Sequence, residues 1–470
     1  MKVYDFVIIG GGSAGLTAAA YAVQFGARTL IIEKRKIGGD CTWYGCIPSK
    51  TLLKIASVAQ EIRTADRYGL EVQNPRVNLS KVMEEVQKTI LSVYEEESPE
   101  KLKADGIDVL IGPAKFLDSH RLIVQEEEIH ARKILIATGA GPLIPDIPGI
   151  NNIQYQTYET IWQLKSLPEH LVVLGGGSVG CELAQAFRRL GSDVTLIEQG
   201  DRLLPREDKQ SSVTLKEVFA EEGIQMRFST SPNSFRKDED GIHINLGNEE
   251  LICDELLVAV GRTPNVTELS LDKAGIKFGK MGVEVDNFLR TTQKHIFAAG
   301  DCIGDYQFTH YAGWQAAMAT RNALLPGNSP GKSSFVPGTI FTDPEIAQMG
   351  LSEDQAREKY GQNCLIFERP MANVDRARTE YNTRGFIKLI HHRNGTILGV
   401  TIVAARAGEM INEWSLAMQN KIKISDISNS IHVYPTFSML NMQASADIRM
   451  NQLLNSSLGK FLKGNVKNKN

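Results

Sequence analysis

The sequence has little of what marks a secreted, membrane-bound or nucleic-acid-binding protein. Six cysteines in 470 residues are too few for a secreted disulfide scaffold. No apolar run reaches the roughly 20 residues of a membrane span, and glycines interrupt the N-terminal apolar stretch where a signal peptide would be continuous. A net charge of -3 gives no general attraction to nucleic acid or anionic lipid. We therefore expect a cytoplasmic protein with no membrane span and no nucleic-acid partner.

Glycine, by contrast, is abundant, and many of the 41 glycines gather at a few points. The first of these points follows an apolar run at residues 4–9 and precedes an alanine-rich stretch that reaches about residue 25. A second apolar run at 29–32 ends at Glu33. The order strand, glycine turn, helix and strand predicts one βαβ unit of a parallel sheet.

The first glycine loop has the Gly10-x-Gly12-x-x-Gly15 spacing of dinucleotide-binding sites. In such loops the first glycine makes the tight turn, and the second lets the backbone approach a pyrophosphate. The third lets the helix pack on the strand, and the helix N-terminus faces the anion. Glu33 lies at the end of the second strand, where a carboxylate accepts hydrogen bonds from ribose hydroxyls. The unit therefore predicts a dinucleotide site.

A second unit repeats every element of the first. Apolar runs at 171–174 and 194–197 flank a helical stretch at 181–190 and the loop Gly175-x-Gly177-x-x-Gly180. Its strand ends at Glu198, whose carboxylate would repel the extra phosphate of NADP, so we expect NADH. Arg202 and Arg206 follow closely and could pair with that phosphate, which leaves NADPH as the alternative.

The stretch from Gly38 to Lys50 holds two cysteines, Cys41 and Cys46. Pro48 is typical of a first helical turn, so Cys46 is expected at a helix N-terminus, where the dipole lowers a thiol pKa. Cys41 is near enough in sequence to close a small, readily reduced disulfide, and Lys50 adds positive charge. The alternatives are a zinc site, which lacks two further ligands here, and inert core cysteines.

The remaining chain suggests further domains, as its length also does. We expect long helices at 48–65 and 78–105 and a linker at 139–149. Strands at 385–390 and 397–403, with two amphipathic helices, predict an α+β domain at the C-terminal end. Residues 451–470 are expected to form a basic tail.

These motifs together resemble the pyridine nucleotide-disulfide oxidoreductases, which include dihydrolipoamide dehydrogenase, glutathione reductase and mercuric reductase. The match extends to Ala137-Thr-Gly139, Val260-Gly-Arg-Thr-Pro-Asn265 and Phe297-Ala-Ala-Gly-Asp301. The resemblance implies an α/β fold with two Rossmann-like dinucleotide-binding domains, for FAD and NAD, plus an α+β C-terminal dimerisation domain, and hence a homodimer. The expected divisions are 1–150 for FAD and the cysteine pair, 151–268 for NAD(P), 269–336 for a segment completing the FAD region, and 337–450 for dimerisation.

The resemblance also implies roles for individual residues. Lys50 and Glu182 would form an ion pair beside flavin N5, while Cys46 would contact the flavin and Cys41 the substrate. No resident metal ion is implied. The residues expected to bind the cofactors are Gly10, Gly12, Ser13, Ala14, Gly15, Glu33, Gly39, Lys50, Ala114, Gly139, Gly175, Gly177, Gly180, Glu198, Gly261, Asp301 and Thr309.

The stretch around Tyr434 bears on the electron acceptor. Family members that act on thiols carry a His-Glu acid/base pair here, whereas this chain has Tyr434 and Met439. A phenol with a pKa near 10 is a poor base at neutral pH. Mercuric reductases carry a tyrosine at this position that helps hold the metal, so Tyr434 is an expected catalytic residue. We expect the protein to lack two marks of that branch, an N-terminal metal-carrying domain and a C-terminal cysteine pair, and Trp43 stands where relatives usually have Asn.

Three interpretations follow for the function. The leading one is an FAD enzyme that passes electrons from NADH through the Cys41–Cys46 disulfide to a soft metal ion or another small acceptor. The second is a divergent dihydrolipoamide dehydrogenase, or another disulfide reductase, in which His432 serves as the base. The third, from another class, is a redox-sensing protein that binds flavin.

Overall fold

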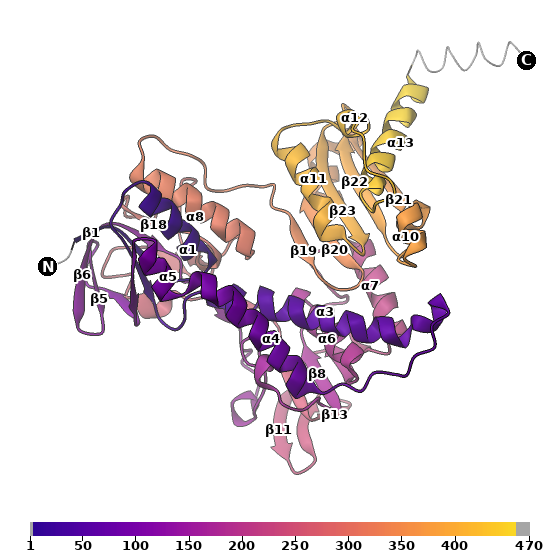
Figure 1. Cartoon of the computed structure of the whole chain (residues 1–470), viewed down its shortest axis with the longest axis horizontal. Coiled ribbons are helices and arrows are strands. Elements are labelled where there is room, and N and C mark those ends of the chain that lie inside the picture. The colour runs from indigo at the N-terminus through magenta and orange to yellow at the C-terminus, as the bar shows by residue number, and fades with distance from the viewer. Residues whose placement is uncertain (1–2, 457–470) are drawn as a thin grey trace, which may run out of the picture. The chain divides into compact units, whose positions relative to one another are not determined.

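A computed structural model of the chain describes residues 3–456. The chain divides into two compact units (Figure 1). Unit 1 comprises Met1–Asp201 and Ala220–Ser333, and unit 2 comprises Arg202–Phe219 and the chain from Ser334 onward. Among the described residues no helix is both long and apolar enough to cross a bilayer.

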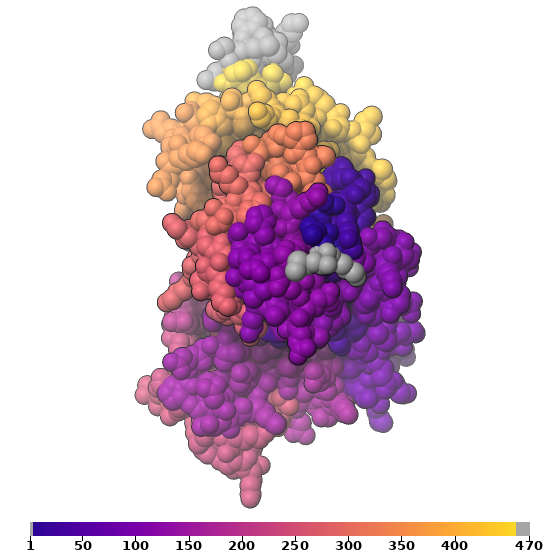
Figure 2. Space-filling model, turned by 90° about the vertical axis from the view of Figure 1, so that its left-hand side faces the viewer, coloured from indigo at the N-terminus to yellow at the C-terminus, as the bar shows by residue number. Residues whose placement is uncertain are grey.

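The first sheet of unit 1 has seven strands and carries the first glycine loop. Five of its strands are parallel: β1 (Val3–Ile9), β2 (Thr29–Glu33), β3 (Ile107–Ile111), β6 (Glu127–Ile136) and β18 (Ile296–Ala298). The antiparallel strands β5 (Arg121–Val124) and β4 (Ala114–Phe116) extend it on one side, at the surface seen in Figure 2. The predicted strands at 4–9 and 29–32 are confirmed. Most of their side chains are apolar and buried because both faces of this parallel sheet are covered.

Helices α1 (Ser13–Gln24) and α8 (Thr309–Leu324) pack side by side on this sheet (Figure 1). Both helices turn buried alanines toward the core, including Ala18, Ala19, Ala316 and Ala319. Small side chains let the two helices approach the sheet closely, and this brings the start of α8 near the first glycine loop.

The cysteine stretch forms α2 (Gly39–Trp43) and α3 (Cys46–Arg63), so the helix predicted from residue 48 begins two residues earlier. One prediction is wrong here. The single helix expected at 78–105 is broken into α4 (Leu79–Tyr94) and α5 (Pro99–Ala104). The Ser98 side chain accepts a hydrogen bond from the Lys101 N–H and Pro99 follows it, so the chain ends one helix and starts another at this point.

The second sheet of unit 1 carries the second glycine loop. Its parallel strands lie in the order β10 (Gln225–Arg227), β9 (Asp193–Ile197), β8 (His170–Leu174) and β14 (Glu255–Val258). Helix α6 (Ser178–Leu190) follows the loop, and the antiparallel strands β11 (Ser234–Asp238), β12 (Gly241–Asn245) and β13 (Glu250–Cys253) form a smaller sheet.

The expected linker at 139–149 is partly wrong. Residues Ala140–Pro142 form β7, which pairs with β15 (Arg262–Pro264). Gly139, with φ +67°, turns the chain after β6 so that β7 meets β15, a partner distant in sequence.

Unit 2 contains a five-stranded antiparallel sheet. Its order is β19 (Gly338–Ile340), β20 (Glu345–Gly350), β23 (Ile397–Ala404), β22 (Phe386–His392) and β21 (Cys364–Pro370). Helices α11 (Ala407–Gln419) and α13 (Met439–Asn455) cover it around the fully buried Trp414. Helix α13 runs through Asn455, so the first residues of the expected basic tail are helical; residues 457–470 lie outside the described part of the chain.

Candidate active site

The two glycine loops have the same local geometry. Gly10 and Gly175 both adopt φ +111°, a conformation that side chains disfavour. A Cβ on Gly15 would lie 1.9 Å from the Gly10 carbonyl oxygen, and a Cβ on Gly180 would lie 1.9 Å from that of Gly175. These positions therefore require glycine because the helix must touch the strand it follows.

The middle glycines are different. Gly177 has nothing within 4 Å of where its Cβ would be, and Gly12 has only the Cα of Gly39, at 3.6 Å. Each lies directly before the first turn of a helix, α1 or α6, whose N–H groups face outward. A missing side chain at a helix N-terminus is the cradle that a pyrophosphate fits, so the residues present fit two dinucleotides.

The two acidic residues close these loops in the same way. Glu33 accepts a hydrogen bond from the Gly11 N–H at 2.7 Å, and Glu198 accepts one from the Gly176 N–H at 2.6 Å. Each carboxylate therefore lies at the carboxyl end of its second strand, beside the loop, where a ribose would be held.

The thiols of Cys41 and Cys46 form the reactive centre. Both cysteines are partly buried and free, and Cys46 is the first residue of α3. A hydrogen bond with the Cys41 thiol, aided by Thr309 and Lys50, lowers the pKa of Cys46 to about 6 despite its burial. The same contact raises the pKa of Cys41. The Thr309 hydroxyl oxygen lies 3.2 Å from the Cys46 sulfur. The pair therefore shares one proton, with the negative charge on Cys46.

The predicted ion pair of Lys50 and Glu182 is present. The Lys50 Nζ lies 2.8 Å from Glu182 Oε2, and the Glu182 side chain is nearly buried on α6. Lys50 is one turn into α3, on the helix that begins with Cys46. The contact thus joins the cysteine helix to the helix of the second loop.

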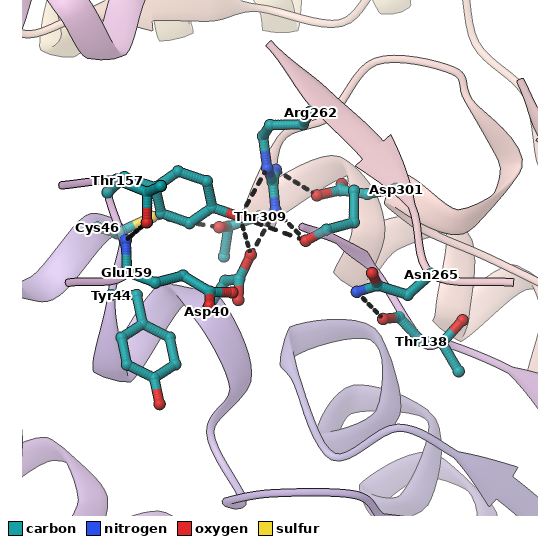
Figure 3. A network of polar contacts seen from close by, with 12 residues as sticks. Asp40, Tyr44, Cys46, Thr138, Thr157, Glu159, Arg262, Asn265, Asp301 and Thr309 are labelled. Carbon is teal, nitrogen blue, oxygen red and sulfur yellow. Dashed lines mark hydrogen bonds and ion pairs between the residues drawn. The ribbon is translucent and has the colours of Figure 1, made fainter. Parts of the chain in front are cut away.

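A cluster around Arg262 was not predicted from the sequence. Its guanidinium lies between Asp40 and Asp301, each 2.5 Å away (Figure 3). Tyr158 donates a hydrogen bond to Asp40 at 2.9 Å. Burial raises the pKa of Asp301, and Arg262 opposes that shift. Arg262 lies in the Val260–Asn265 motif of the sequence. A charged arginine inside that motif, which would need carboxylate partners in the folded protein, was the feature that could have predicted this cluster.

The other expected cofactor residues lie at several places in unit 1. Asp301 and Thr309 bound the segment leading into α8, and Gly39 approaches the first loop, since its Cβ would lie 2.7 Å from the Gly12 Cα. Ser13 and Ala14 begin α1. Three residues lie at chain turns or edges: Ala114 on the outer strand β4, Gly139 after β6, and Gly261 before β15.

Tyr434 and His432 belong to unit 2. The Tyr434 hydroxyl donates to Asp375 at 3.1 Å, and this hydrogen bond raises its pKa. The side chain is exposed, at 66 %. His432 instead points inward: its side chain is 9 % exposed and its Nε2 lies 3.0 Å from Glu413 Oε1.

Comparison with known proteins identifies the family. The profile of the family described as "Pyridine nucleotide-disulphide oxidoreductase" matches residues 4–317, and that of its dimerisation domain matches 336–444. The chain belongs to the pyridine nucleotide-disulphide oxidoreductases. The predicted family and fold class are thereby confirmed, and so is the prediction of a flavin-dependent enzyme. Members bind FAD and use a pyridine nucleotide.

Individual members are similar over nearly the whole chain. Mercuric reductase from Bacillus cereus is 33% identical over 93% of this chain and 70% of its own. Dihydrolipoyl dehydrogenase from Thermus scotoductus is 32% identical over 95% of this chain and 97% of its own. A solved structure, the Cu(II) complex of the HOCl-induced flavoprotein disulfide reductase RclA from Escherichia coli, is 30% identical with a TM-score of 0.87, covering 95% of this oxidoreductase and 100% of that chain.

Proposed function

We propose that this oxidoreductase uses NADH to reduce a soft metal ion held by the Cys41 and Cys46 sulfurs. Bound FAD supplies the two-electron relay between the nicotinamide and the thiol pair. For a divalent ion such as Hg(II), the balance is NADH + Hg(II) → NAD⁺ + H⁺ + Hg(0).

The shared-proton thiol pair carries this proposal. A Cys46 pKa of about 6 makes its sulfur a thiolate at neutral pH, and Cys41 is within hydrogen-bonding contact of it. Thiolates are the ligands that soft metal ions prefer. Once such an ion displaces the shared proton, both sulfurs are bound as thiolates and no base is required.

The residues of unit 2 support a reaction without a base. Because its hydrogen bond to Asp375 raises the Tyr434 pKa, the phenol stays protonated at neutral pH. Its oxygen can still position or weakly ligate a metal ion. We expect this to occur across a homodimer, since the chain carries the family's dimerisation domain. The similarity to mercuric reductases and to a reductase solved as a Cu(II) complex agrees with a metal acceptor.

The second candidate is a lipoamide or other disulfide reductase. The His432–Glu413 contact favours it, because a histidine oriented by a carboxylate is the usual thiol base. Yet His432 Nδ1 also lies 3.1 Å from the Ser430 carbonyl oxygen, so both ring nitrogens are engaged inside unit 2. Because the chain is 32% identical to a dihydrolipoyl dehydrogenase, lipoamide is included among the acceptors to be tested.

NADH is the proposed electron donor because Glu198 lies at the loop where a 2′-phosphate would be held. Arg202, which could neutralise such a phosphate, donates instead to the Pro205 and Glu207 carbonyl oxygens. The Arg202 guanidinium therefore already has hydrogen-bond partners within unit 2.

The experiment is an NADH oxidation assay of purified FAD-loaded protein with Hg(II), Cu(II), lipoamide and oxidised glutathione. We expect turnover with Hg(II) or Cu(II) and rates at least about tenfold lower with both disulfides. The Cys41→Ser/Cys46→Ser protein is the control and should lose the metal-dependent rate. Brisk lipoamide turnover with no response to either metal would establish the second candidate instead.

A further inference from the structure

Arg262 joins two parts of the site that are far apart in the sequence. It comes from β15, its side chain is 20 % exposed, and its two terminal nitrogens contact Asp40 and Asp301 separately (Figure 3). One nitrogen also donates to the Ala140 carbonyl oxygen at 3.0 Å. A partly buried guanidinium shared by two carboxylates has a fixed direction, because each contact is a charge-assisted hydrogen bond. We call Asp40, Arg262 and Asp301 the arginine clamp.

Each carboxylate of the arginine clamp leads to one of the thiols. Asp40 directly precedes Cys41 on α2. Asp301 begins the segment that ends at Thr309, whose hydroxyl oxygen lies 3.2 Å from the Cys46 sulfur. Arg262 therefore ties the backbone that carries Cys41 to the segment that contacts Cys46.

The backbone around Cys41 needs such an anchor. Helix α2 has only five residues. It begins at Gly39 directly after Gly38, both with positive φ, so its own hydrogen bonds do little to fix it. On the other side of Cys41, the Thr42 hydroxyl donates to Glu97 at 2.8 Å. Cys41 is thus held between two anchors, of which the Asp40 contact is the one that carries full charges on both sides.

We infer that Arg262 and Asp40 are positioning residues, which hold the Cys41 sulfur where it reacts with Cys46. The benefit is a high effective concentration of one thiol toward the other, since an oriented pair has already lost the freedom that bond formation would remove. The inference rests on the proposed role of Cys41 and Cys46 as the redox pair. It adds residues to that site that touch neither sulfur.

The test measures the disulfide equilibrium directly. FAD-loaded protein is equilibrated with glutathione, and the constant is obtained for dithiol + oxidised glutathione ⇌ disulfide + two reduced glutathione. Asp40→Ala should lower this constant about tenfold, which corresponds to about 30 mV for a two-electron couple. Tyr158→Phe is the matched control: it removes the hydroxyl that donates to Asp40 and accepts from Arg262 Nε, but keeps both ion pairs, and should change the constant by less than about twofold.

Further variants separate positioning from general damage. Arg262→Lys replaces two fixed, separately directed donor nitrogens by one ammonium on a flexible chain and should reproduce part of the Asp40→Ala effect. The FAD content of Asp40→Ala is measured together with the constant, and the constants of variant and wild-type protein are compared at equal FAD occupancy. If that variant does not retain FAD, Asp40→Asn, which keeps the side chain's shape without its charge, decides in its place.

If the equilibrium constant for disulfide formation were unchanged or larger in the Asp40 variant, the inference that Asp40 and Arg262 position Cys41 would be refuted. The failure of the underlying proposal has a different signature. Wild-type protein whose Cys41 and Cys46 form no disulfide with oxidised glutathione would refute the redox pair itself, whatever the variants do.

Discussion

Cys46 is the residue whose chemistry can be tested most directly. After two-electron reduction, its thiolate should contact oxidised FAD and give a long-wavelength charge-transfer band. Because the folded-state pKa of Cys46 is lowered to about 6, the thiolate and the band are present above that pH and are lost as the pH falls through it. Titration of the band by absorption spectroscopy checks this expectation.

The two cysteines should differ when each is replaced. Cys46→Ser should abolish the band, whereas Cys41→Ser should show it without reduction because no disulfide can form. The hydrogen bond from Cys41 is the main cause of the lowered Cys46 pKa, so in Cys41→Ala, which has no donor at this position, the band should titrate at a higher pH. Persistence of the band in Cys46→Ser would contradict the assigned roles.

Glu198 gives a second prediction for a single residue. With its carboxylate beside the Gly176 N–H, NADH should exceed NADPH in kcat/KM by at least about tenfold, or about 1.4 kcal/mol. Glu198→Gln keeps a hydrogen-bond acceptor without the charge and should reduce the ratio of kcat/KM for NADH to kcat/KM for NADPH. Steady-state kinetics with both nucleotides measure this preference. Equal kcat/KM values for the wild-type protein would contradict the proposal that NADH is the preferred donor.

At the level of the βαβ element, replacing two glycines of one loop by alanine should destabilise the fold by different amounts. A Cβ on Gly180 would meet the Gly175 carbonyl oxygen, so Gly180→Ala should lower the free energy of unfolding by about 3 kcal/mol. Gly177 has open space and a negative φ, so Gly177→Ala should cost only about 1 kcal/mol, the loss expected when alanine replaces glycine at an N-cap.

For NADH binding, we expect Gly177→Ala to be the more harmful of the two substitutions. An alanine methyl at position 177 occupies the space that a pyrophosphate would approach, so Gly177→Ala should raise the KM for NADH severalfold while thermal unfolding is little changed. Calorimetry and steady-state kinetics on the two variants separate packing from binding. A stable Gly180→Ala protein would refute the packing argument.

For the whole molecule, the exposed stretch before α13 bears on assembly. Ile431, Val433 and Tyr434 are all largely exposed, and such an apolar group is typical of an interface. We expect a homodimer in which Tyr434 reaches the thiols of the partner subunit. Tyr434→Phe should then slow metal-dependent NADH oxidation about tenfold and leave flavin reduction by NADH unchanged, as stopped-flow absorbance at the flavin band would show.

A matched control is Tyr21→Phe, which alters another exposed tyrosine, on α1. It should leave both rates at the wild-type level. Light scattering gives the oligomeric state independently of activity. A monomer, or equal metal-dependent rates in the two variants, would show that Tyr434 takes no part in the reaction.

Much of unit 1 could be predicted because its signals are local. The glycine loops require particular backbone angles and the absence of a Cβ, and both demands are met by residues within a few positions of one another. The start of α3 at Cys46 follows from Pro48 in the same way. The break at Pro99 was also local, yet the helical pattern on either side of it concealed the cap at Ser98.

The sequence by itself determined the two βαβ units, the paired cysteines and, through resemblance, the ion pair of Lys50 with Glu182. Only the tertiary structure decided that Arg262 bridges Asp40 and Asp301, and that β7 pairs with β15. Arg262 and Asp40 are 222 positions apart. The physical reason is that backbone angles and capping depend on neighbours in the chain, whereas a buried charge finds its partners only when the folded sheets bring distant segments together.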